Sequence, residues 1–178
     1  MKTVILNISD IHYGSEASEN EGLVLSAFIK DVEEQTAKMV YDDIFVVIGG
    51  DLVFAASDKS YDGFDKDIVI KLMDVLNIDR SHFIIVPGNH DLKNSFIGDV
   101  EESFMPIFNS RFEEGKFNDL LRKNAQHEML FGKFASFETY LKQKMLVDNF
   151  SMQCGYYSLN EFWSVHTLNT AILSCGGY

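Results

Sequence analysis

Three short apolar segments, each followed within a few positions by polar residues, constrain the fold of this chain more than any other feature. They are Thr3–Ser9, Asp43–Ile48 and Phe83–Val86, and they have the character of central strands in a parallel sheet. Between them the apolar residues follow a helical period, over residues 19–40 and about 63–77. This alternation predicts two consecutive βαβ units, and hence an α/β fold with a largely parallel sheet and flanking helices.

The rest of the chain differs in character. Residues 95–155 are rich in Phe, Met, Leu, Glu and Lys, and they predict two or three helices that form an insertion or cap. Aromatic residues at helical spacing there, such as Phe134 and Phe137, favour helix packing over a cofactor site. From Gly155 the pattern returns to strand, with residues 156–159 and 162–173 predicting a hairpin that continues into the sheet, which makes the sheet mixed. We interpret residues 1–178 as one domain.

Composition narrows the classes of partner. The chain has 27 acidic and 15 basic residues, a net charge of −12, which disfavours non-specific binding to duplex nucleic acid but leaves a local phosphate site possible. No apolar run approaches the roughly 18–20 residues of a membrane span, so no membrane partner is expected. Cys154 and Cys175 have neither zinc-site spacing nor a disulfide framework, which is typical of reduced thiols in a cytoplasmic protein.

Candidate metal ligands follow each predicted strand. The carboxyl ends of parallel strands meet at one edge of a sheet, so these side chains should converge there. Carboxylate, imidazole and amide groups suit Mn, Fe, Zn or similar divalent ions, and two such ions roughly 3.5–4 Å apart can activate water for phosphoryl displacement. Turn formation alone explains one such loop but poorly explains three in register. The candidate ligands are Asp10, His12, Asp51, Asn89 and His90, and Asp91 follows them directly in the chain.

Three of these segments carry a resemblance to a known family. Ser9-Asp10-Ile11-His12, Gly50-Asp51 and Gly88-Asn89-His90-Asp91 resemble the first three motifs of the calcineurin-like metallophosphoesterases, and Leu168-Asn169-Thr170 resembles a strand that follows the cap. The resemblance implies a four-layer α/β/β/α sandwich. It also implies an enzyme with two divalent metal ions, which hydrolyses a phosphate mono- or diester through a metal-bridging hydroxide.

The same resemblance assigns a role to each residue. Asp10 and His12 would bind the first metal ion, Asp51 would bridge the two ions, and Asn89 would bind the second. His90 would be a catalytic histidine that stabilises or protonates the leaving oxygen without binding metal. Asp91 would orient His90 through a hydrogen bond.

The chain departs from the family pattern after the third motif. The family continues with a lone His and then Gly-His-x-His, which complete both metal sites, and this chain has neither. His127 and His166 are the remaining downstream histidines, and they are more typical of a surface and a packing position; His82 is interpreted as structural. We therefore expect an incomplete domain, and two alternatives stay open. One is a non-catalytic phosphoesterase-like module, and the other is the N-terminal nuclease or phosphodiesterase effector of a larger protein.

Overall fold

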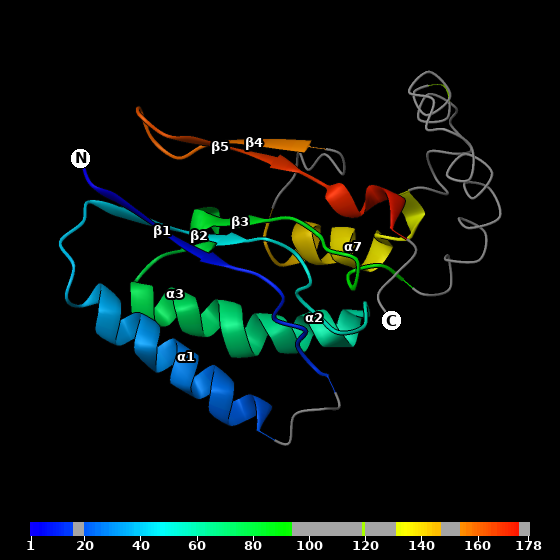
Figure 1. Ribbon diagram of the computed structural model, residues 1–178, viewed down its shortest axis with the longest axis horizontal. Helices are drawn as coiled ribbons and strands as arrows, with labels where there is room; N and C mark the ends of the chain where they lie inside the picture. The colour runs from blue at the N-terminus through cyan, green and yellow to red at the C-terminus, as the bar shows by residue number, and fades with distance from the viewer. Residues whose placement is uncertain (16–19, 94–118, 120–130, 147–153, 175–178) are drawn as a thin grey trace.

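The parallel sheet lies at the centre of the molecule. The computed structural model describes residues 1–15, 20–93, 119, 131–146 and 154–174. Within them β1 (Thr3–Ile8), β2 (Asp43–Ile48) and β3 (Phe83–Ile85) form a parallel sheet in the order β1-β2-β3. Ile8 pairs with Ile48, and Ile48 pairs with Ile85, so the carboxyl ends of the strands are level at one edge (Figure 1). The predicted parallel sheet is confirmed.

The crossover helices cover one face of this sheet. The first is α1 (Glu21–Thr36), and the second is a continuous helical segment made of α2 (Asp58–Phe64), a π-helical turn η1 (Asp65–Val69) and α3 (Ile70–Leu76). It begins earlier than predicted because the hydroxyl of Ser57 accepts a 3.1 Å hydrogen bond from the backbone N–H of Ser60 and caps the helix. A short 3₁₀ helix, η2 (Arg80–His82), then leads into β3.

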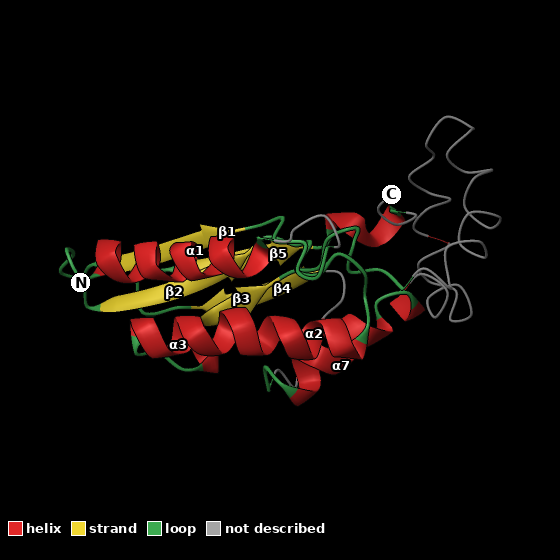
Figure 2. Cartoon of the chain, turned by 90° about the horizontal axis from the view of Figure 1, so that it is seen from below, coloured by secondary structure: helices red, strands yellow, loops and turns green. Residues whose placement is uncertain are grey.

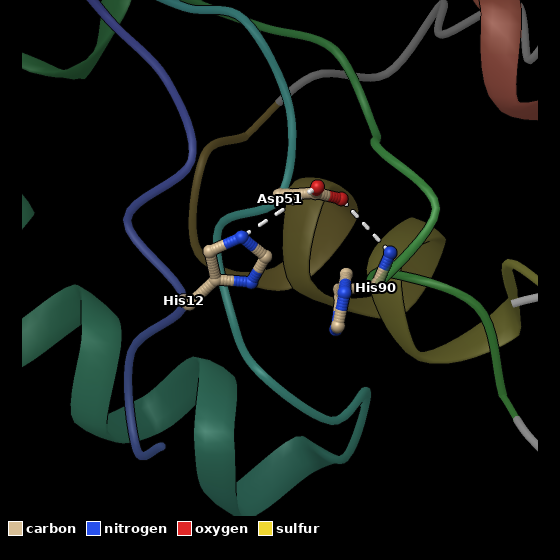
Figure 3. A group of neighbouring side chains, drawn as sticks. All are labelled: His12, Asp51 and His90. Carbon is tan, nitrogen blue, oxygen red and sulfur yellow. Dashed lines mark hydrogen bonds and ion pairs between the residues drawn. The ribbon is translucent and has the colours of Figure 1, made fainter. Parts of the chain in front are cut away.

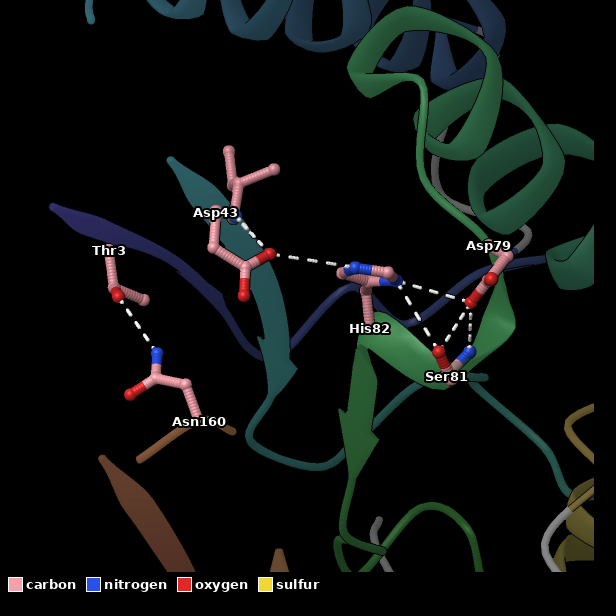
Figure 4. A network of polar contacts seen from close by, with 7 residues as sticks. Thr3, Asp43, Asp79, Ser81, His82 and Asn160 are labelled. Carbon is pink, nitrogen blue, oxygen red and sulfur yellow. Dashed lines mark hydrogen bonds and ion pairs between the residues drawn. The ribbon is translucent and has the colours of Figure 1, made fainter. Parts of the chain in front are cut away.

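A β-hairpin lies on the opposite face of the sheet. Figures 1 and 2 show α1 and α3 side by side on one side of the parallel sheet, and the hairpin of β4 (Cys154–Ser158) and β5 (Ser164–Leu168) on the other. At the hairpin turn the Asn160 side chain donates a 3.0 Å hydrogen bond to the hydroxyl of Thr3 in β1 (Figure 4). The described residues thus form a mixed α/β structure with three layers of the expected sandwich: helices, parallel sheet and hairpin.

The predicted second strand of the hairpin is too long. Only Ser164–Leu168 is extended, and the 3₁₀ helix η4 (Thr170–Leu173) follows. The reason is local, because the side chain of Asn169 accepts a 3.0 Å hydrogen bond from the N–H of Ala171 and starts a helical turn. Among the described residues β4 and β5 pair only with each other, so the expected continuation into the parallel sheet is not seen.

Most of the predicted helical insertion, residues 95–155, lies outside the described residues. Within it, α7 (Ala135–Gln143) is a helix that packs on α2. Phe137 and Leu141 are buried in the main core, which confirms that the aromatic periodicity serves helix packing. The last two residues of the predicted insertion, 154 and 155, belong to β4 instead.

His82 has the structural role expected of it. Its Nδ1 lies 3.1 Å from Oδ1 of Asp79, and its Nε2 lies 3.6 Å from Oδ1 of Asp43 (Figure 4). The ring of His82 also stacks on that of Phe45. These contacts tie the amino-terminal ends of β2 and β3 together, at the edge of the sheet opposite the three motifs. Within the described part of the chain, no helix is long and apolar enough to cross a membrane.

Candidate metal centre

The loops that follow the three strands continue the parallel pairing beyond the sheet. The N–H of Asp10 donates to the carbonyl of Gly50 at 3.1 Å, and the N–H of His12 donates to the carbonyl of Asp51 at 2.9 Å. Asp10, His12 and Asp51 all have left-handed backbone conformations, with φ of 55°, 48° and 52°. Each costs about 1–2 kcal/mol in a non-glycine residue, and such strain concentrates at functional sites.

Three of the predicted site residues converge on one point (Figure 3). One ligand atom each from His12, Asp51 and His90 lies within 4.8 Å of the others. Nε2 of His12 is 3.8 Å from Oδ2 of Asp51, which is too long for a hydrogen bond. Nδ1 of His12 is buried and has no hydrogen-bond partner among the described residues. Neither nitrogen of this ring is satisfied by the described protein groups, as expected of an imidazole that serves as a ligand.

A cavity of about 230 Å³ opens beside this group. Asp51 lines it together with Asp10 and Asn89, so Asp51 belongs to both the cavity and the histidine cluster. The structure therefore brings the five candidate residues Asp10, His12, Asp51, Asn89 and His90 to one edge of the sheet. Beyond the three loops, the cavity is lined by Thr170, Ala171 and Ser174, from η4 and the residue that follows it.

Glycines allow the second and third loops to approach each other. A Cβ built on Gly88 would overlap both Oδ1 and the backbone nitrogen of Asp51. Gly50 has a φ of +109°, and a Cβ there would lie 2.9 Å from the nitrogen of Gly88. The N–H of His90 donates a 2.8 Å hydrogen bond to Oδ1 of Asp51, so the third loop fixes the carboxylate of the second. Glycine is required at both positions because any side chain would separate the loops.

A comparison with protein-family models gives the decisive match. The model of the Calcineurin-like phosphoesterase covers residues 3–168 of the chain. The chain belongs to the calcineurin-like phosphoesterase family. Members of this family are generally hydrolases that act on phosphate esters and use divalent metal ions. Comparison with curated proteins and with solved structures gave no match.

The carboxylate of Asp91 makes other contacts than the hydrogen bond to His90 that the resemblance implies. This buried carboxylate accepts hydrogen bonds from Gly88 N–H at 2.8 Å, Leu52 N–H at 3.2 Å and the Tyr61 hydroxyl at 3.0 Å. Burial raises the pKa of Asp91 to about 6, although these hydrogen bonds act to lower it. The carboxylate therefore joins the second and third loops to α2, and it does not orient the ring of His90.

A backbone carbonyl holds the His90 ring in its place. Nδ1 of His90 lies 3.0 Å from the carbonyl oxygen of Phe54. A carbonyl only accepts hydrogen bonds, so Nδ1 carries the hydrogen, and in the neutral ring Nε2 keeps the lone pair. The Phe54 ring also lies 5.5 Å from His90, and the rings of His90 and His12 meet edge to face at 4.4 Å.

Two residues of the site were missed by the sequence analysis. Phe54 belongs to the apolar run Leu52–Ala56 in the loop after β2, and nothing in this local pattern points to a histidine contact. Tyr61 has the spacing of a core residue on a helix, and the hydrogen bond of its hydroxyl to Asp91 depends on packing across the sheet edge. Of the downstream histidines, His127 lies outside the described residues. His166 is exposed on β5, with its ring 4.9 Å from that of Tyr156.

The donor set at this edge of the sheet fits divalent ions. Carboxylate oxygens, an amide oxygen and imidazole nitrogens are hard to borderline ligands, and there is no thiol among the cavity-lining or clustered residues that the structure describes. The unpartnered Nδ1 of His12 and the strained backbones of Asp10, His12 and Asp51 are independent observations that favour a ligand at this position.

Proposed function

We propose that this chain hydrolyses a phosphate mono- or diester at a binuclear site that holds two divalent ions, with Mn, Fe or Zn as the favoured metals. The observation that carries the proposal is the shared position of Asp51. Asp51 lines the cavity with Asp10 and Asn89, and its carboxylate also contributes to the cluster with His12 and His90. A carboxylate has two oxygens and can serve two ions, which a neutral ligand does less well.

The ligands are assigned as the resemblance of the three motifs to the family implies. Asp10 and His12 come from the same loop after β1 and would hold one ion, and Asn89 after β3 would contribute its amide oxygen to the other. Divalent ions held there supply the acidity that makes water a nucleophile near neutral pH, and they neutralise charge on the phosphoryl oxygens. The chain's own contribution is to fix these ligands through the strained loops and the bond from His90 N–H to Asp51.

His90 is proposed as the general acid. The Phe54 carbonyl keeps a hydrogen on Nδ1, so the proton that moves is the one at Nε2. In the imidazolium form, Nε2–H can be given to the leaving oxygen of the ester as the phosphorus–oxygen bond breaks. Phe54 covers one side of the ring, which limits its rotation.

The substrate class follows from charge and size. The net charge of −12 favours a small phosphate ester over a non-specific duplex substrate. The cavity of about 230 Å³ is smaller than the roughly 300–1,000 Å³ of pockets that enclose drug-sized ligands, so it would take the phosphoryl group and leave the rest of the substrate outside.

The exposed free thiol of Cys154 supports a reducing, cytoplasmic location.

Two substitutions test the proposal. Asp51→Asn is expected to abolish Mn(II) binding and turnover, because it removes a negative ligand shared by both ions. His90→Ala is expected to keep Mn(II) bound while slowing hydrolysis by about 10²-fold or more, as for loss of a general acid. Calorimetric titration of the metal-depleted protein with Mn(II) measures binding, and hydrolysis of bis(p-nitrophenyl) phosphate measures turnover.

Asp74→Asn is the matched control, since it removes one carboxylate charge from an exposed position on α3. It is expected to bind Mn(II) and hydrolyse the diester like the parent. If Asp51→Asn and His90→Ala also match the parent, the assigned site is wrong. If the parent neither binds Mn(II) nor hydrolyses esters, the chain is a non-catalytic module and the enzymatic proposal fails.

A further inference from the structure

Lys133 is a buried lysine in the turn that precedes α7. Its side chain is almost fully covered, with a relative exposure of 1% for the residue. The ammonium donates hydrogen bonds to the carbonyls of Ser174 at 2.6 Å and Ile172 at 2.8 Å, and it reaches Ala171 at 3.5 Å. Burial of an ammonium group is unfavourable unless its donors are satisfied, so these carbonyls hold the charge in place.

These carbonyls belong to the segment that closes the cavity. Thr170, Ala171 and Ser174 line the same cavity as Asp10, Asp51 and Asn89. The carbonyls at the end of a helical turn carry partial negative charge, which a cation stabilises. Lys133 therefore fixes η4 from its buried side, while the hydroxyl-bearing residues Thr170 and Ser174 line the cavity.

The backbone of the same residue holds the other wall. The carbonyl of Lys133 accepts a 2.7 Å hydrogen bond from the N–H of Lys93, which lies just after the Gly88–Asp91 loop. Asn89 of that loop lines the same cavity as η4. One residue thus connects both walls, through its side chain to η4 and through its main chain to the third loop. The separation of the two walls depends on Lys133.

We propose that Lys133 is a positioning residue that sets η4 against the metal-binding loops, and that the hydroxyls of Thr170 and Ser174 bind the phosphoryl oxygens of the substrate. Hydroxyl groups donate hydrogen bonds to phosphate oxygens, and among the described residues that line the cavity Thr170 and Ser174 are the ones with a hydroxyl side chain. Lys133 acts through η4 and does not contact the substrate itself. This inference rests on the phosphoesterase function proposed above. It adds the residues that would hold the phosphoryl group of the substrate.

The first test measures the wall directly, without metal or substrate. In Lys133→Met the long side chain is kept but its donors are lost, so hydrogen exchange of the Ala171 and Ser174 amides should accelerate by about tenfold or more. Amides of β1 and β2 should exchange as in the parent. Lys133→Arg should restore part of the protection because the guanidinium also donates several hydrogen bonds. Lys142→Met is the control, since Lys142 is exposed and its ion pair within the described residues is with Glu138.

The second test measures the substrate side. With Mn(II) and bis(p-nitrophenyl) phosphate, Lys133→Met, Thr170→Val and Ser174→Ala should each raise KM by about tenfold, because the substrate is misplaced or loses a hydrogen bond. Mn(II) affinity should stay at the parent value, since no proposed ligand lies on η4. The KM of Lys133→Arg should lie closer to the parent value than that of Lys133→Met. Thr170→Val and Ser174→Ala keep the test decisive if Lys133→Met does not fold.

The outcomes separate this inference from the proposed function. If the parent hydrolyses the diester but all three variants keep its KM, the inference is overturned and the function stands. Unchanged exchange of the η4 amides in Lys133→Met also overturns it. If the parent is inactive, the proposed function fails. The affinity of the Mn(II)-loaded parent and variants for inorganic phosphate is then measured in place of KM. Weaker phosphate binding by the variants then supports the wall assignment, and parent-like binding overturns it.

Discussion

The backbone N–H of His90 donates a 2.8 Å hydrogen bond to Oδ1 of Asp51, so the third loop of the site directly orients the carboxylate of the second. This bond forms only because Gly88, two residues before His90, has no side chain to occupy the space of Asp51. The carboxylate proposed to serve both metal ions is therefore held by the backbone of its neighbour.

Gly88→Ala is expected to weaken Mn(II) binding by about 10-fold or more, in the range typical of lost support around a metal ligand. The added Cβ would overlap Oδ1 and the backbone nitrogen of Asp51, so the carboxylate or its loop must move. Calorimetric titration with Mn(II) measures the change. Gly22→Ala on α1 is the matched control, because a Cβ there meets no atom within 4 Å. Equal affinities in the two variants would contradict the described packing.

Tyr61→Phe is expected to destabilise the metal-free protein by about 1–3 kcal/mol, the cost of leaving a buried acceptor without one of its donors. The Tyr61 hydroxyl donates to Oδ1 of Asp91, and this bond acts to lower the pKa of that carboxyl. Its loss should raise the pKa of Asp91 above its present value of about 6. Urea unfolding measures the stability. Tyr41→Phe is the control, and a loss as large in that variant would mean that the Asp91 contact is not the cause.

Tyr13→Phe is expected to change the pH dependence of stability. The Tyr13 hydroxyl donates a 2.6 Å hydrogen bond to Asp67, which lowers the pKa of Asp67. The pKa of an aspartate in the unfolded chain is about 4, and that of Asp67 is lower in the folded protein. Such a carboxylate stabilises the fold at pH values above its unfolded-state pKa. This stabilisation is lost as the pH falls through its folded-state pKa. The difference in unfolding free energy between parent and variant should therefore be largest above about pH 5 and shrink below about pH 3.

Urea unfolding across this pH range tests the Tyr13 prediction. Tyr156→Phe is a suitable control, since Tyr156 is exposed on the hairpin and far in the chain from Asp67. Its difference from the parent should stay constant with pH. A constant difference for Tyr13→Phe as well would show that the hydrogen bond does not perturb Asp67.

Arg80→Met is expected to destabilise the fold by about 3–5 kcal/mol, because it leaves the buried carboxylate of Asp65 without its partner charge. Arg80 binds Asp65 through two nitrogens, at 2.6 and 2.9 Å, and the Tyr140 hydroxyl of α7 lies 3.4 Å from the same carboxylate. The double variant Asp65→Asn with Arg80→Met should lose less unfolding free energy than Arg80→Met alone, because it has no unpaired buried charge at this position. Lys142→Met, which breaks an exposed pair, should cost no more than about 1 kcal/mol.

Much of the fold and part of the site could be predicted from local patterns. Apolar runs with a strand period and segments with a helical period gave β1, α1, β2 and β3 close to their observed bounds. The order of these elements then placed Asp10, Asp51 and Asn89 at one edge, because parallel strands end on the same side of a sheet. The boundaries that failed, at Ser57 and Asn169, depend on single side-chain caps that local periodicity does not reveal.

Contacts between distant segments were beyond the reach of those patterns. Whether Asp91 meets His90 or Tyr61, and whether Lys133 meets η4, depends on how separate elements pack, since the partners lie 30 or more positions apart in the chain. The spacing of apolar residues along the chain is a local property. It indicates which segments are helices or strands and which residues lie at their ends. The pairing of individual atoms, such as Nδ1 of His90 with the Phe54 carbonyl, arises only when burial forces each polar group to find a partner in three dimensions.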